Sequence, residues 1–224
     1  MSLFSISKAI IRRDFNQVAR KPTDLLTIFC FFILSAGIFS IGIGPDPILL
    51  KMIGSGVIWA SALLASILAM GELFTADERD GVLEQIMLKP EPVSMIIFVR
   101  IISHWLTTGL PIVLVSPVLG VIFGYKMEVL SIVVISLFLG TPVLSFLSAV
   151  GAALTLGIRG GTALGALLIL PLYVPVLIFG SLAIQAAIEG TEPGAHLSLL
   201  LALLIFALVL SPISVVLSLK VALD

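Results

Sequence analysis

The sequence predicts an all-α membrane protein with six transmembrane helices, an N-terminal interfacial helix and one short charged helix between two of the spans. Three observations support this fold class: the composition, six long apolar runs, and an uneven distribution of positive charge. Hydrophobic residues make up 59% of the 224 residues and charged residues 11%, whereas a soluble domain is roughly 45–50% apolar and about 25% charged. A globule of this length has too little interior to remove that much apolar surface from water. The composition therefore excludes a soluble enzyme, and a disordered or fibrous chain with it.

Several other classes of protein are excluded by what the sequence lacks. The formal net charge is −1 and there is no basic patch, so nucleic acid is not expected as a partner. The single cysteine, Cys30, rules out an intrachain disulfide, a CxxC pair and a CxxCH haem-attachment motif. No Gly-Lys dipeptide occurs, so there is no Walker A loop. We expect neither catalytic residues nor a metal site in this chain, and any ATP must be bound by another subunit.

Six apolar runs are long enough to cross a bilayer, whose core of about 30 Å requires roughly 20 apolar residues in a helix. Treating residues 1–224 as a single transmembrane domain, we place the spans at 25–44, 52–71, 96–124, 129–157, 162–184 and 197–219. Prolines occur within the last four spans, and each leaves a carbonyl without its helical partner. Because lipid cannot satisfy that carbonyl, we expect these helices to pack against one another or line a cavity. The third and fourth spans are also long enough to be tilted or broken.

Positive charges give the expected orientation. With the N-terminus inside, ten of the twelve lysines and arginines lie on the cytoplasmic side, and only Lys51 and Lys126 lie outside. This is the bias that the positive-inside rule describes. We therefore expect a multi-pass protein with both termini in the cytoplasm.

Residues 1–21 are charged and apolar by turns and do not form the hydrophobic core of a signal peptide. A helical projection places these apolar side chains on one side: Leu3, Ile6, Ile10, Ile11, Phe15 and Val18. The pattern favours a basic amphipathic helix in contact with lipid at the membrane interface. The alternative is a positively charged flank that only sets the topology.

The most informative stretch is the charged segment, residues 72–95, between the second and third spans. It holds eight charged side chains. Its Thr75 and Glu78 fit a capping box, and Gly81 permits a break before an apolar stripe that includes Leu83 and Met87. We expect a short amphipathic helix over 80–88 that docks on a soluble partner and passes its motion to both spans. The alternative is a solvated loop that only joins two helices.

Two ionisable residues lie within the third span. Arg100 and His104 are four residues apart and share a helix face, with Trp105 beside them. An ionisable group at this depth is a functional hypothesis by default. The His104 imidazole could ligate haem iron or hydrogen-bond a neighbouring helix. No Asp or Glu lies in the middle of any span, so we expect energy for transport or mechanical work to come from outside the chain.

Particular segments resemble known families. The run from Glu78 to Met87 resembles the cytoplasmic coupling segment of ABC-2-type exporter membrane subunits. Nearly the whole chain resembles the CcmB family of cytochrome c maturation, through residues 42–47, 83–90, 103–111, 139–142, 151–157 and 171–180. Lys89 and Ser103 depart from the pattern that we expect of that family.

The resemblance implies a non-catalytic, six-span ABC-2-type permease in the bacterial inner membrane. It would pair with an ATP-binding cassette subunit that holds ATP and Mg²⁺, with a second copy of itself, and with a haem-handling membrane subunit. Haem would be the cargo, or ATP hydrolysis would release a haem-loaded periplasmic chaperone. The residues that would couple to the ATPase subunit are Glu78, Arg79, Asp80, Gly81, Leu83, Glu84, Gln85 and Met87. Haem ligation would mostly belong to the partner, with His104 as the one candidate contact here.

Two alternatives to this function stay open from the sequence. An ABC-2 permease that exports a lipid, a polysaccharide or a drug would share the six spans and the charged segment. A scaffold that never moves would also share them. The segments at 103–111 and 171–180 favour the CcmB interpretation over the export of another cargo. A crosslink between the second and third spans that left function intact would support the scaffold.

Overall fold

The computed structural model describes residues 3–20, 22–44, 46–71, 73–88 and 92–223, and all regular structure within them is α-helix. The helices are α1 (Leu3–Arg20), α2 (Pro22–Ile43), α3 (Pro47–Met70), α4 (Thr75–Arg79), α5 (Val82–Met87), α6 (Val93–Ile122), α7 (Met127–Leu154), α8 (Gly161–Glu189) and α9 (Gly194–Leu223). Six of them are long and apolar enough to cross a membrane. The predicted all-α fold class with six spans is therefore confirmed.

The spans begin shortly before the apolar runs that predicted them, and α3 does so with a side-chain cap. The Asp46 side chain accepts hydrogen bonds from the backbone N–H groups of Ile48 (2.9 Å) and Leu49 (3.4 Å). Pro47 occupies the first turn, where its missing N–H leaves no bond unmade. At α3 a polar residue thus extends the helix beyond the stretch that hydropathy detects, whereas α6, α7 and α8 begin without a side-chain cap.

The prolines do not break the helices. Pro111 and Pro117 lie inside α6, and Pro142 lies inside α7, yet both helices are continuous. The expectation of a broken third or fourth span is therefore wrong. Around Pro142, every residue from Gly140 to Phe146 is buried, so neighbouring helices hold the backbone in place where the proline removes a helical bond.

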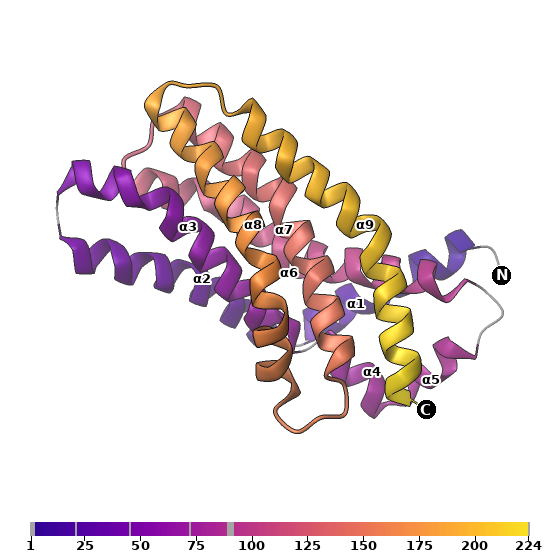
Figure 1. The fold of residues 1–224 in the computed structure, drawn as a ribbon. Coiled ribbons are helices and arrows are strands. Elements are labelled where there is room, and N and C mark those ends of the chain that lie inside the picture. Colours follow the sequence, from indigo (N-terminus) through magenta and orange to yellow (C-terminus); the bar gives the residue numbers. More distant parts are fainter. Residues whose placement is uncertain (1–2, 21, 45, 72, 89–91, 224) are drawn as a thin grey trace.

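Helix α7 lies at the centre of the bundle and packs against α3, α6, α8 and α9. Helix α2 lies at the edge and packs on α3, while α1 lies against α6 (Figure 1). A tryptophan, Trp59, fills the space between three helices of the core. The Trp59 ring of α3 is fully buried against Gly140 of α7 and Gly180 of α8. A Cβ atom at Gly180 would lie 2.1 Å from that ring, so these helices approach closely only because both positions are glycine.

The two ends of the bundle differ in what they carry (Figure 1). Both ends of the chain, α4, α5 and the α7–α8 connection lie toward one end, which we call the charged end. The α2–α3, α6–α7 and α8–α9 connections lie toward the other. The structure therefore groups the segments that the charge bias assigns to the cytoplasm.

Candidate functional site

The charged segment forms two short helices, α4 and α5, instead of one. Gly81 separates them with a φ angle of +65°, a left-handed conformation that glycine adopts without steric cost. The predicted capping box is wrong, because Thr75 lies inside α4 and its hydroxyl donates to the carbonyl of Gly71. Gly71 is the residue that ends α3, so only a short connection separates α3 from α4.

The two faces of this segment differ in exposure. Leu83 is fully buried, and Met87 packs partly buried against the core. The opposite side, which we call the outer face, consists of the exposed residues Arg79, Asp80, Glu84 and Gln85. The predicted amphipathic pattern thus forms. Its apolar side packs on the bundle, and its charged side is exposed.

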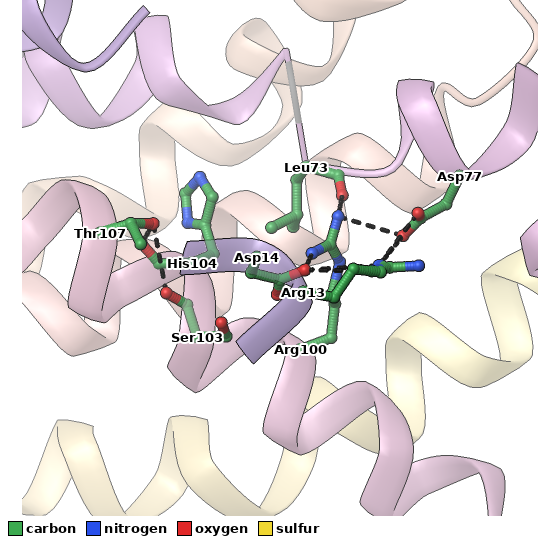
Figure 2. A network of polar contacts seen from close by, with 8 residues as sticks. All are labelled: Arg13, Asp14, Leu73, Asp77, Arg100, Ser103, His104 and Thr107. Atoms are coloured by element: carbon green, nitrogen blue, oxygen red, sulfur yellow. Dashed lines mark hydrogen bonds and ion pairs between the residues drawn. The ribbon is translucent and has the colours of Figure 1, made fainter. Parts of the chain in front are cut away.

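Beneath α4, a group of charged side chains connects three helices (Figure 2). Arg100 of α6 forms ion pairs with Asp14 of α1 and, at 3.0 Å, with Asp77 of α4. Its guanidinium also donates to the Leu73 carbonyl oxygen at 3.2 Å. Arg13 lies 3.1 Å from Asp77 on the other side. We call Arg13, Asp14, Asp77 and Arg100 the ion-pair network.

The network is balanced in charge and mostly buried, although the Arg13 side chain is 35% exposed. Asp14 is 5% exposed, Asp77 is 2% exposed, and the Arg100 side chain is 11% exposed. Two arginines face two aspartates, so the formal charges cancel. Removing one partner from a buried pair leaves an uncompensated charge and typically costs about 3–5 kcal/mol. The network therefore holds α1, α4 and α6 in one fixed arrangement.

The sequence analysis found Arg100 but missed both of its carboxylate partners. The signal for Asp14 was present, because it lies four residues after Ile10 and three after Ile11 and so shares their face. Phe15, which the helical projection placed on the apolar face, is 48% exposed. Among residues 8–16 of α1, whose side chains the structure describes, Asp14 is the one that is buried against the bundle.

His104 connects α6 to α3. Its Nε2 atom lies 3.3 Å from the carbonyl oxygen of Ala69, and its Nδ1 atom lies 3.5 Å from the Thr108 hydroxyl. The contact with Ala69 requires a proton on Nε2, because a carbonyl oxygen can only accept. In this arrangement Nε2 serves as a helix–helix bridge.

Trp105 connects α6 to α7. Its indole N–H donates to the Thr141 hydroxyl at 3.0 Å, and its ring meets Phe138 edge-on with centroids 5.7 Å apart. Arg100, His104 and Trp105 thus link α6 to four neighbours: α1 and α4 through Arg100, α3 through His104, and α7 through Trp105.

The fold and the site define a polytopic helical membrane protein whose charged segment is joined to its spans by buried ion pairs. Its sequence matches the family described as CcmB protein over residues 5–222. The chain belongs to the CcmB family, which confirms the resemblance seen in its segments.

Relatives match over almost their full length. "Heme exporter protein B" of Pseudomonas aeruginosa is 39% identical over 218 residues, which cover 97% of this chain and 98% of the relative. The protein of the same name from Haemophilus influenzae is 40% identical over 215 residues, 96% of this chain and 97% of the relative. That from Escherichia coli K12 is 37% identical over 215 residues, 96% of this chain and 98% of the relative.

Proposed function

We propose that this chain is the membrane subunit of an ATP-driven complex that handles haem in c-type cytochrome biogenesis at the bacterial inner membrane. Family membership and the name of its relatives, Heme exporter protein B, support haem as the cargo of the complex. The six apolar helices support a multi-pass location. The subunit itself is non-catalytic, and a separate ATP-binding cassette subunit holds ATP and Mg²⁺.

The observation that carries the proposed mechanism is the ion-pair network. The outer face of α4–α5 docks on the ATPase subunit at the cytoplasmic surface. Movement of α4 during ATP hydrolysis pulls on Asp77 and, through Arg100, on α6 and α1. Because the pairs are buried and specific, the motion is transmitted and not absorbed by a flexible loop.

At the other side of the membrane, this motion has one of two consequences. It opens a path between helices, or it alters contacts with a haem-handling subunit and so releases a haem-loaded periplasmic chaperone. A second copy of this chain beside the first makes the arrangement symmetric. His104 stays a secondary candidate for a haem contact, which would require its Nε2 atom to leave Ala69.

Reversing one charge on the outer face tests the mechanism. We expect Glu84→Lys to abolish both stimulation of ATP hydrolysis and cytochrome c assembly at normal expression, because Glu84 is exposed where the ATPase subunit docks. The matched control is Glu192→Lys, a change at another exposed glutamate at the opposite end, which should leave both activities intact. If Glu84→Lys retains both, the docking assignment is wrong.

A further inference from the structure

We infer that a recess beside α4 binds the headgroup of an ethanolamine phospholipid from the membrane leaflet at the charged end. The primary ammonium of the headgroup donates hydrogen bonds to the Glu78 carboxylate, which lines the recess. This inference goes beyond the proposed function and does not depend on it, since it requires only that the chain lies in a bilayer. The recess has a volume of about 280 Å³, several times the roughly 30 Å³ that one water molecule occupies in the liquid.

The recess lies beside α4, where α3 and α7 end and α8 begins. Its lining includes Met70, Phe74, Thr75, Glu78, Thr155 and Leu156. Glu78 reaches from α4 to the α7–α8 connection, because its Oε1 atom lies 3.5 Å from the position that a Cβ atom on Gly157 would occupy. The Glu78 carboxylate therefore turns toward the recess and not toward the outer face.

Glu78 is a half-buried carboxylate without a cation. The ion pairs among the described residues all belong to Asp14 and Asp77, the carboxylates of the ion-pair network. A carboxylate that is partly removed from water without a partner is costly. A cation that enters the recess from outside the chain would remove that cost.

The hydroxyl groups in the recess favour a ligand that donates hydrogen bonds. The Thr75 hydroxyl donates to the Gly71 carbonyl, and the Thr155 hydroxyl donates to the Gly151 carbonyl. Because a hydroxyl carries one hydrogen, both oxygens can only accept from a ligand. An ammonium has three N–H donors and no acceptor, so it matches the recess in hydrogen bonding as well as in charge.

The helix ends around the recess favour the same charge. The carboxyl ends of α3 and α7 carry the negative ends of their helix dipoles, which attract cations. Helix α8 begins at the recess with the opposite polarity. However, the N–H groups of Gly161, Ala163 and Leu164 already donate to backbone carbonyls, so few donors remain for an anion.

Two observations indicate a lipid as the source of the ammonium. Exposed leucines continue from the recess toward the membrane on both helices, Leu64 and Leu68 on α3 and Leu164 and Leu168 on α8, and acyl chains can lie along them. Arg79 is exposed at the recess, where its guanidinium can pair with a phosphodiester. One carboxylate and one guanidinium together match the two charges of a zwitterionic headgroup.

Binding of lipids with identical acyl chains tests this inference. The full chain is purified in detergent and mixed with dioleoyl phosphatidylethanolamine, its N-methyl or N,N-dimethyl form, or dioleoyl phosphatidylcholine, and native mass spectrometry counts the bound lipid. We expect binding to fall stepwise as methyl groups replace N–H donors, with phosphatidylcholine retained severalfold less than phosphatidylethanolamine. The series uses the unchanged protein, so it does not depend on the folding of a variant. Equal retention of all four lipids overturns the inference.

A matched pair of variants locates the site. Glu78→Gln keeps the size of the side chain and removes its charge, so it should lower retention of phosphatidylethanolamine to the level of phosphatidylcholine. Glu192→Gln, at the opposite end, should leave the preference unchanged. If Glu78→Gln keeps the full preference, the lipid binds elsewhere and the assignment to this recess is wrong.

Two other sources of the ammonium are outcomes that overturn the inference. If free phosphoethanolamine displaces the lipid at equal concentration, the acyl chains contribute nothing and the ligand is not a lipid. If a carbodiimide joins Glu78 to a lysine of the ATP-hydrolysing subunit in the assembled complex, the recess holds a protein side chain. In that case the lipid inference fails and the proposed function stands.

Discussion

Arg100 lies where an unpaired charge would be costly, and its partners explain how it is accommodated. A guanidinium near the end of a membrane span can extend toward water. Here it turns instead toward two buried carboxylates, Asp14 and Asp77. The ion pairs therefore join different helices, and a displacement of α4 would change the distances within them.

Removing charges from this network should reveal coupling between them. We expect Arg100→Gln and Asp77→Asn each to destabilise the purified protein, Arg100→Gln by about 3–5 kcal/mol because it leaves buried carboxylates without their main partner. Asp77→Asn should cost less, since Arg100 keeps Asp14. The double variant should cost less than the sum, which thermal unfolding in detergent measures as a double-mutant cycle. Strict additivity would show that the pair does not act as a unit.

At the scale of elements, a feature could be predicted when the sequence pattern that determines it lies within one segment. The six spans were predicted because the length of an apolar run is a local property, and the structure places a helix at each run. The amphipathic pattern around Leu83 was readable for the same reason. Helix ends were less accurate; at α3, for example, the capping residue Asp46 lies outside the apolar run.

The ion-pair network was not predictable in this way. Its members come from α1, α4 and α6, and Arg13 and Asp77 are 64 positions apart in the sequence. Knowing that Asp77 faces Arg100 requires knowing which helices are neighbours, and hydropathy carries no such information.

The contact between Trp59 and Gly180 gives a prediction about helix packing. Gly180→Ala puts a methyl group 2.1 Å from the Trp59 ring, so we expect a loss of about 1–3 kcal/mol from overpacking. Gly56→Ala is the matched control, since a Cβ atom there meets nothing within 4 Å, and alanine favours a helix by roughly 0.5–1 kcal/mol. Thermal unfolding should show the first variant less stable than wild type and the second at least as stable.

A companion variant identifies the cause. Adding Trp59→Phe to Gly180→Ala removes part of the ring that the methyl group would meet, so stability should recover in part. If the combination is no better than Gly180→Ala alone, steric conflict with Trp59 is not the reason for the loss.

For the whole molecule, the proposed function depends on the orientation of the protein in the membrane. An ATP-hydrolysing subunit can reach α4 and α5 only if the charged end, which also carries residues 155–160, faces the cytoplasm. Ten lysines and arginines on that side against two on the other predict this orientation. The structure agrees with this prediction, because these segments lie at the same end of the bundle.

Cysteine labelling in spheroplasts tests the orientation directly. In a Cys30→Ala chain, single cysteines are introduced as Lys126→Cys and as Arg159→Cys, both at exposed positions. A membrane-impermeant maleimide should label the first from outside and reach the second only after the membrane is opened. External labelling of Arg159→Cys in intact spheroplasts would place the outer face away from any cytoplasmic ATPase. The ion-pair network would then hold helices together without receiving force from ATP hydrolysis.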